Sequence, residues 1–186
     1  MMRYLVAVVL LAVSFHAHAS EALWKRLQTE PNLVVLMRHA HTGSGNPLTW
    51  DSTGQCKDER MLTEQGRTLA RRLGEEFKKR KIAPVVISSP MCRTRETATL
   101  AFGSAVTDPD LREIASAEAG QKKAFRDKAT QLLLKHRGAK PVVFVSHRPN
   151  IDALAFEVIA IGDLLVGRIG DDGEVEVLGR IRPQPQ

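Results

Sequence analysis

The segment VVLMRHAHTG, residues 34–43, decides the architecture, because an unbroken apolar run ends abruptly in Arg38, His39 and His41. An apolar run rich in β-branched residues is typical of a strand that is covered on both faces. The charged and imidazole side chains come at the carboxyl end of this strand. The strand therefore gives them a rigid support.

Two later apolar runs end in the same way. The run over residues 84–88 is followed by Ser89 and, one helical turn further on, by Arg93, and the run over residues 141–146 leads into His147. Segments with helical spacing and helix start and stop signals separate the runs. Helices are predicted at residues 64–80, 90–102, 123–138 and 148–160.

Strands that alternate with helices predict a mainly parallel sheet between two layers of helices. The expected fold class is thus α/β, a three-layer α/β/α sandwich. The last two strands, at residues 163–170 and 173–181, are expected to form an antiparallel hairpin at one edge. With 43% hydrophobic and 26% charged residues, the composition is globular, and we expect residues 20–186 to form a single domain.

Turn and cap residues set the expected helix ends. Thr63 is a candidate N-cap for the first of these helices, and Ser89 with Pro90 is a candidate N-cap and first helical position for the second. Gly103 is the expected stop of the second helix. Residues 41–61 form a long loop without a clear period, which compact domains usually keep for a function.

Residues 1–19 have the pattern of a secretory signal peptide. A positive start is followed by an apolar run and by Ala17-His18-Ala19, the small residues that signal peptidase requires. The apolar run is shorter than the roughly 20 residues needed to span a bilayer. We expect cleavage after Ala19, a periplasmic or secreted mature chain, and no stable membrane span.

The charge pattern does not favour a nucleic-acid partner. Of the 27 Lys and Arg side chains, against 21 Asp and Glu, many lie between Arg67 and Lys81 on one predicted helix. No aromatic residues alternate with them to stack on bases, so a solvated helix face is the better interpretation. A mild attraction for phosphorylated, anionic substrates is compatible with this surplus.

Cys56 and Cys92 are the two cysteines of the chain. In an exported protein a pair of cysteines favours a disulfide bond, because oxidising compartments preserve such bonds. Two free buried thiols are the alternative. A bond would tie the long loop to the residue before Arg93.

The carboxyl ends of parallel strands share one edge of a sheet, so Arg38, His39, Arg93 and His147 are expected to meet there. Arginine matches phosphate oxygens through paired hydrogen bonds and cannot bind a metal, which favours an anion site and most of all a phosphate site. A metal site with His39, His41 and His147 as ligands ranks second, because flanking cations repel a divalent ion. A neutral imidazole beside a bound phosphate can attack phosphorus and form a phosphohistidine.

These residues resemble the histidine phosphatase superfamily, also called the phosphoglycerate mutase-like superfamily. Arg38-His39-Ala40 resembles its RHG/RHA motif, residues 62–66 its LTxxG helix start, residues 88–98 its SSPxxRTxxTA segment, and Ser146-His147 its late SH pair. The resemblance implies that His39 is the phosphorylated nucleophile. It assigns Arg38, Arg93 and His147 to the phosphate pocket, with His147 also in the catalytic set, and implies no metal and no cofactor.

The proton donor is less directly indicated. Glu113 lies in an LRE segment that is similar to the one that carries the proton donor of mutase-like members, and Asp58 and Glu59 in the long loop are alternatives. The extended insert of the mutases is nearly absent, since residues 114–120 alone separate this segment from the next helix. An open pocket is expected, which the 41–61 loop covers.

Four further side chains near these motifs have no settled role. Trp50 in the loop either packs against a substrate or anchors the loop, and Arg60 either contacts phosphate or pairs with a carboxylate. No catalytic role is expected for His41 or Arg148.

The resemblance and the leader together favour an exported phosphomonoesterase. A mutase must protect its phosphoenzyme from water, which a short insert suits poorly. Some exported relatives resemble phosphatases of lipopolysaccharide core heptose phosphates, so the expected substrate is a phosphorylated small molecule or glycolipid of the envelope. The alternatives are a phosphoprotein (phosphohistidine) phosphatase and a non-catalytic phosphate-ligand binding protein.

Overall fold

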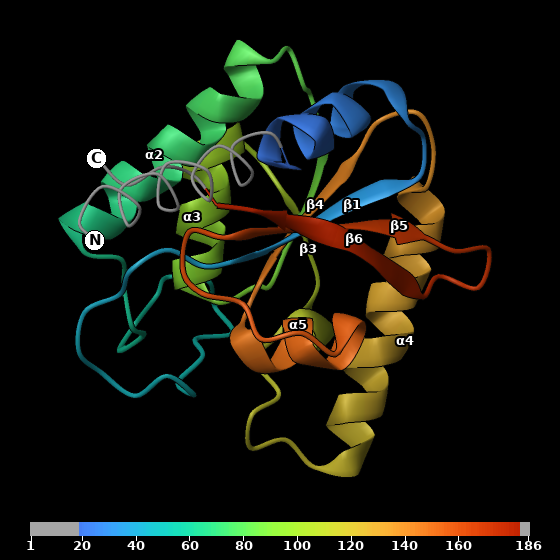
Figure 1. Cartoon of the computed structure of the whole chain (residues 1–186). Coiled ribbons are helices and arrows are strands. Elements are labelled where there is room, and N and C mark those ends of the chain that lie inside the picture. Colours follow the sequence, from blue (N-terminus) through green and yellow to red (C-terminus); the bar gives the residue numbers. More distant parts are fainter. Residues whose placement is uncertain (1–18, 183–186) are drawn as a thin grey trace, which may run out of the picture.

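The computed structural model describes residues 19–182, and a six-stranded sheet with the order β3-β2-β4-β1-β5-β6 lies at its centre (Figure 1). The four strands from β3 to β1 are parallel, and β5 and β6 form the antiparallel edge. The predicted parallel sheet and edge hairpin are confirmed. The strands are β1 (Leu33–Arg38), β2 (Val85–Ser88), β3 (Val106–Thr107), β4 (Val142–Ser146), β5 (Leu164–Ile169) and β6 (Val175–Ile181).

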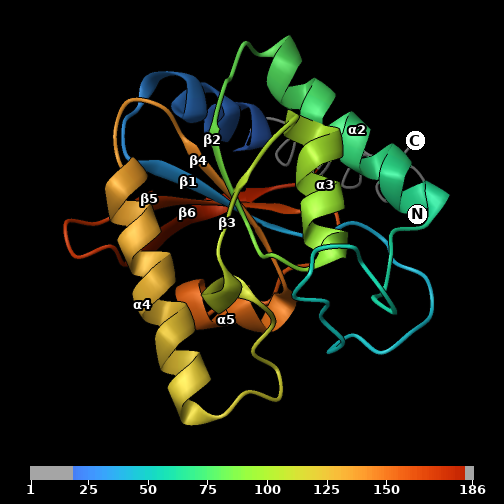
Figure 2. The ribbon, with the colours of Figure 1, turned by 180° about the vertical axis from the view of Figure 1, so that it is seen from behind.

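Helices cover both faces of the sheet, as the two opposite views show (Figures 1 and 2). Alternate residues of β1 point to opposite faces. Val34 and Leu36 belong to the core under α4 and α5, whereas Val35 and Met37 belong to the core under α2 and α3. The helices are α2 (Glu64–Lys79), α3 (Cys92–Phe102), the 3₁₀ turn η1 (Pro109–Leu111), α4 (Ala119–His136) and α5 (Arg148–Ala155).

A helix over residues 19–29, which the sequence pattern did not predict, packs on the face of α2. Its Trp24 meets Phe77 edge to face, with ring centroids 5.0 Å apart, and Arg80 lies over the same indole. Except for Ala19, the expected signal peptide lies outside the described residues. None of the helices in the described range 19–182 is long and apolar enough to cross a membrane.

The helix ends confirm two predicted caps and correct three boundaries. Thr63 is the N-cap of α2 and accepts a hydrogen bond from the Gly66 N–H at 3.1 Å, and Gly103 ends α3. The predicted start of α3 at Pro90 is wrong by two residues, because Met91, whose N–H donates to the Ser89 hydroxyl, is still extended and is the N-cap. The α4 helix begins four residues before the predicted position, and α5 ends at Ala155, because the next residue is left-handed.

The long loop is closed at its base and anchored to α3. Thr42 and Leu62 form an isolated antiparallel bridge, so the two ends of the loop lie together. The Cys56–Cys92 disulfide, with Cα atoms 5.7 Å apart, joins the loop to the first residue of α3. The expected disulfide is therefore present in the structure.

Candidate active site

The site lies where the connections after β1 and β4 leave the sheet toward opposite faces. β1 and β4 are parallel neighbours, yet β1 leads to α2 and β4 leads to α5 on the other side. Such a switch in direction opens a crevice at the carboxyl ends of the strands. His39 follows β1 and His147 follows β4, and their ring centroids are 5.6 Å apart.

His39 is held as a neutral imidazole with one nitrogen free. Its Nδ1 is 2.9 Å from the carbonyl oxygen of Ala40, so Nδ1–H is the donor and the unprotonated Nε2 keeps its lone pair. Burial lowers the pKa of His39 to about 3 and outweighs the Ala40 hydrogen bond, which acts in the opposite direction, and the charges of Arg93 and Arg38 add to the lowering. At neutral pH this ring can act as a nucleophile without first losing a proton.

The backbone around His39 is fixed by residues of the neighbouring elements. The His39 N–H donates to the Ser146 carbonyl at 3.0 Å, and the Ala40 N–H donates to the Thr97 hydroxyl at 3.1 Å. Thr97 in turn donates to the Arg93 carbonyl. The nucleophile segment is thus tied to β4 and to α3.

His147 is buried between Arg93 and Ser89. Nη2 of Arg93 lies 3.1 Å from Nδ1 of His147, and Nε2 of His147 lies 2.8 Å from the Ser89 hydroxyl. Because arginine only donates, Nδ1 is the acceptor and Nε2–H donates to Ser89. Burial, followed by the nearby positive charges, lowers the pKa of His147 well below its usual value.

Two arginine side chains bring donors with no acceptor into this crevice. Nε of Arg38 and Nη1 of Arg93 are buried and have no hydrogen-bond partner among the residues that the structure describes. A buried guanidinium donor without an acceptor is costly, and an anion with several oxygens would satisfy both. Burial, together with the charges of Arg148 and Arg60, lowers the pKa of Arg38, as expected where cations crowd one site. The arrangement can bind a phosphate group.

Glu113 is the carboxylate that the structure brings to the pair of histidines. Its Oε2 lies 2.5 Å from Nη2 of Arg93 and 3.8 Å from Nδ1 of His147, and the side chain is 13% exposed. Burial raises the pKa of Glu113, although the positive charge of Arg93 acts in the opposite direction. A raised pKa keeps a larger fraction of the carboxyl group protonated, which suits a proton donor.

Neither alternative acid reaches this position. Asp58 is exposed at a left-handed turn of the loop. Glu59 is buried, but its two oxygens accept the backbone N–H groups of Asp51 and Cys92 at 2.9 and 2.8 Å. Glu59 therefore links the loop to the start of α3.

The remaining predicted residues are placed as follows. Arg60 donates to the Gly45 carbonyl from its Nε, and its charge still lowers the pKa of both His39 and Arg93. Arg148 is exposed, and the carbonyl of His41 accepts from the N–H of Thr63. Within residues 19–182, no three or more His, Cys, Asp or Glu side chains form a group that could hold a metal ion.

The sequence interpretation missed Thr97 and Asn150, and it named Ser89 without its contact to His147. Thr97 and Ser89 lie within the SSPxxRTxxTA segment, but their hydrogen bonds to Ala40 and His147 join residues that are more than 50 positions apart. Asn150 is fully buried and holds the backbone around Glu113. A polar residue on the apolar face of the predicted helix 148–160 was the available signal for Asn150.

The comparison with known families agrees with this geometry. The model of the histidine phosphatase superfamily, branch 1, matches residues 34–141, which is more than half of the chain. The chain belongs to the histidine phosphatase superfamily. The predicted resemblance to this superfamily is therefore confirmed, and the match spans the first three motifs and ends before Ser146-His147. No curated protein matches the chain in sequence.

Solved structures of this superfamily share the fold of the chain. The open reading frame Rv3214 of Mycobacterium tuberculosis has a TM-score of 0.61 and 21% identity over 81% of this chain and 97% of its own. Phosphoglycerate mutase from Thermus thermophilus has a TM-score of 0.56 and 22% identity over 82% and 99%. A candidate phosphohistidine phosphatase, SixA, from Nakamurella multipartitia has a TM-score of 0.59 and 19% identity over 84% and 100%. At these identities the likeness concerns the fold.

Proposed function

We propose that this histidine phosphatase superfamily member is an exported, metal-independent phosphomonoesterase that works through a phosphohistidine on His39. One observation carries the proposal above all. The His39 ring is neutral, its Nδ1–H is used by the Ala40 carbonyl, and Nε2 is left as the reactive atom. A ring that served only as a buried hydrogen-bonding group would use both nitrogens.

In the first step the phosphoryl group of the substrate lies against Arg38, Arg93 and His147. Nε2 of His39 attacks phosphorus in line, the bond from phosphorus to the ester oxygen breaks, and Glu113 gives its proton to the departing oxygen. The unpartnered N–H groups of Arg38 and Arg93 stabilise charge on the equatorial oxygens. The products are an alcohol and phosphohistidine.

In the second step water replaces the alcohol. The Glu113 carboxylate takes a proton from the water as its oxygen attacks phosphorus, and the bond from phosphorus to Nε2 breaks. Inorganic phosphate forms, His39 is again neutral, and Glu113 is again protonated. The Arg93 contact of Glu113 keeps the carboxyl group within reach in both steps.

Export and substrate are supported by different features. The signal-peptide pattern of residues 1–19 supports a periplasmic or secreted location, away from cytoplasmic intermediates. The short connection between Glu113 and α4, which begins at Ala119, supports hydrolysis over transfer, since little covers the phosphoenzyme. A phosphorylated sugar or glycolipid of the envelope is the substrate class that fits this location.

A phosphohistidine phosphatase that acts on proteins is the second candidate. It is favoured by the likeness in fold to the candidate SixA from Nakamurella multipartitia. A phosphohistidine-containing peptide and a sugar phosphate, offered to the same preparation, distinguish the two functions. The first candidate predicts a higher kcat/KM for the sugar phosphate.

Hydrolysis of p-nitrophenyl phosphate in EDTA, from acid to neutral pH, tests the shared chemistry. The mature chain is expected to turn over this substrate, and His39→Ala is expected to have no activity. Turnover that persists in His39→Ala, or that requires a divalent metal, would refute the proposed mechanism. Phosphate binding by both proteins without turnover by either would favour a binding protein.

A further inference from the structure

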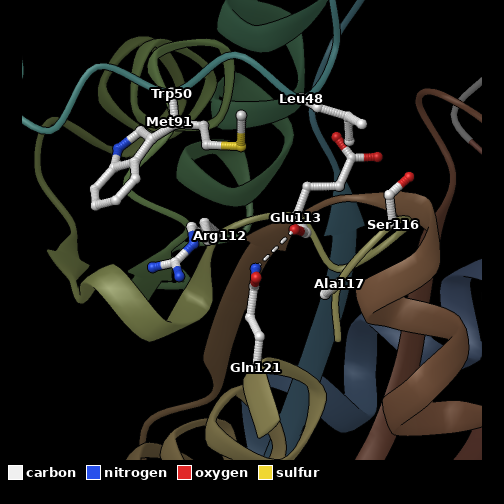
Figure 3. Close-up of a pocket in the computed structure, with 8 residues that line it drawn as sticks. All are labelled: Leu48, Trp50, Met91, Arg112, Glu113, Ser116, Ala117 and Gln121. Carbon is white, nitrogen blue, oxygen red and sulfur yellow. Dashed lines mark hydrogen bonds between the residues drawn. The ribbon is translucent and has the colours of Figure 1, made fainter. Parts of the chain in front are cut away.

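A cavity of about 160 Å³ lies directly beside Glu113 (Figure 3). Its walls come from four separate segments: the 41–61 loop, the residue before α3, the stretch after η1, and α4. Two wall residues, Glu113 and Met91, also contact Nη2 of Arg93. The cavity therefore borders the phosphate pocket on the side of the proton donor.

This position is the one that a leaving group must occupy. A general acid protonates the ester oxygen only within hydrogen-bond reach, so the alcohol that departs has to lie against Glu113. The opposite side of phosphorus belongs to His39, because attack and departure are in line. The alcohol part of the substrate is therefore directed into the cavity.

Trp50 and Arg112 form one wall of the cavity. The guanidinium carbon of Arg112 lies 5.1 Å from the centre of the Trp50 ring, a distance typical of a cation–π contact, and Nη1 of Arg112 donates to the Pro109 carbonyl. Each side chain is thus held by the other. Figure 3 shows both on one side of the cavity and Ser116 on the opposite side.

The chemistry of the walls suits a ring that carries hydroxyl groups. Trp50, Leu48 and Met91 offer apolar surface, and the Arg112 N–H groups and the Ser116 hydroxyl offer hydrogen bonds. An aromatic ring beside a few polar groups binds a ligand with one apolar face and a polar edge.

The size of the cavity limits the group that enters. At about 160 Å³, the cavity is smaller than the pockets of about 300 Å³ or more that hold drug-sized ligands. This space matches a group about as large as a single six-membered ring, whereas a folded protein surface is too large to enter.

We propose that Trp50 and Arg112 form the leaving-group site of this enzyme and select a compact, ring-shaped polyhydroxy alcohol. The inference rests on the proposed phosphatase function and adds the shape of the substrate to it. Any lipid or glycan that the ring carries extends from the open side of the cavity into solvent.

Three substrates with secondary alcohol leaving groups separate shape from reactivity. Inositol 1-phosphate has a hydroxylated ring, cyclohexyl phosphate has a bare ring, and glycerol 2-phosphate has hydroxyl groups without a ring. The parent protein is expected to prefer inositol 1-phosphate over glycerol 2-phosphate by roughly tenfold in kcat/KM, the range of one good ring contact. Equal kcat/KM for these two substrates would overturn the proposal.

Variants assign the preference to the two residues. Trp50→Ala is expected to lower kcat/KM roughly tenfold for both ring substrates and by clearly less for glycerol 2-phosphate, and Trp50→Phe is expected to retain most of the preference. Arg112→Ala is expected to affect inositol 1-phosphate most. Arg126→Ala, which removes an exposed cation of α4, is the matched control. Losses that are equal for the three substrates would overturn the assignment.

A binding measurement separates this inference from the proposed function. If no phosphate ester is hydrolysed, the phosphatase proposal fails, and calorimetric titration of His39→Ala with inositol 1-phosphate and glycerol 2-phosphate still tests the cavity. Tighter binding of the ring that disappears in His39→Ala/Trp50→Ala supports the site. Equal binding of the two ligands contradicts it.

Discussion

The side-chain amide of Asn150 holds the backbone on both sides of Glu113. Its Oδ1 accepts from the Ile114 N–H at 3.2 Å, and its Nδ2 donates to the Arg112 carbonyl at 2.9 Å. Asn150 is fully buried and lies in the first turn of α5, three residues after His147. The start of one helix therefore positions both His147 and, through Asn150, Glu113, the proposed proton donor.

Asn150→Ala is expected to displace Glu113 and so to impair proton donation to the leaving group. A displaced Glu113 should cost on the order of 10²-fold in kcat/KM, which reports the first step alone, for an alkyl phosphate, because the departing alkoxide needs a proton, and much less for p-nitrophenyl phosphate. Glu113→Gln should show the same dependence on the leaving group. If Asn150→Ala lowers kcat/KM equally for both substrates, Asn150 has only a structural role. If Glu113→Gln lowers kcat/KM equally for both, Glu113 is not the acid.

Gly66 is a second position where packing and the site are coupled. A Cβ atom there would overlap the carbonyl oxygen of His41, so α2 would have to move away from the segment that follows His39. Gly66→Ala is expected to lower the free energy of unfolding by about 1–3 kcal/mol and to reduce turnover. Urea denaturation measures the first effect.

Gly43→Ala is the control for this substitution. Gly43 lies in the same region, and nothing is within 4 Å of the position that its Cβ would take. A change within about 0.5 kcal/mol is expected for it. If the two variants are equally stable, the close contact between Gly66 of α2 and the segment after His39 does not contribute to stability.

The strands and their chemically active ends were predictable because parallel strands bring their carboxyl ends to one edge whatever the intervening sequence. His39, Arg93 and His147 were therefore placed together from local patterns alone. The helix cap at Thr63 was predictable from a local pattern, since its partner is Gly66, three residues away.

The contacts between distant segments were not predictable in this way. Glu113, Asp58 and Glu59 are all carboxylates near motifs, and only the fold shows that Glu59 binds the start of α3 while Glu113 reaches Arg93. Ser89 has the local pattern of a cap, and its hydroxyl does accept from the Met91 N–H, but only the fold shows that it also accepts from His147. Trp50 meets Arg112 across 62 positions of sequence, for which no local pattern exists.

The disulfide is expected to stabilise the loop and the phosphate arginine together. Cys56 and Cys92 are 36 positions apart, and in the chain-entropy model this bond contributes about 3–4 kcal/mol. The double variant Cys56→Ala/Cys92→Ala should lose most of this stability. Its KM should rise, because Cys92 directly precedes Arg93 and the bond helps to fix that segment. Thermal unfolding with and without a reducing agent measures the effect.

The double variant is also the control for the reducing agent itself. Its unfolding temperature should not respond to reduction, whereas that of the parent should fall. A parent protein that keeps its stability and KM after full reduction would show that the contacts of Glu59 and Pro47 alone hold the loop.

Stability should fall on acidification because of His39. Its pKa is about 3 in the folded chain and about 6.5 when unfolded, so between these values the unfolded chain binds a proton that the folded chain does not. The stabilisation is complete above pH 6.5 and is lost as the pH falls toward 3. Between pH 7 and pH 4.5 the loss from this group is on the order of 2 kcal/mol.

His39→Gln removes this titration. Its free energy of unfolding should change less between pH 7 and pH 4.5 than that of the parent, and His147 should supply much of the remaining slope, because its pKa is also lowered. Denaturation curves at several pH values measure both slopes. Identical slopes would mean that His39 is not protected from protonation in the folded chain.

The central claim is that Nε2 of His39 carries the phosphoryl group during turnover. Rapid acid-free quenching of the reaction, followed by digestion and mass spectrometry under conditions that preserve phosphohistidine, tests it directly. The account predicts a phosphoryl group on the peptide that contains His39, its accumulation in Glu113→Gln with p-nitrophenyl phosphate, and its absence in His39→Ala. Steady turnover with no phosphorylated peptide in either the parent or Glu113→Gln, or a phosphoryl group on another residue, would contradict the account.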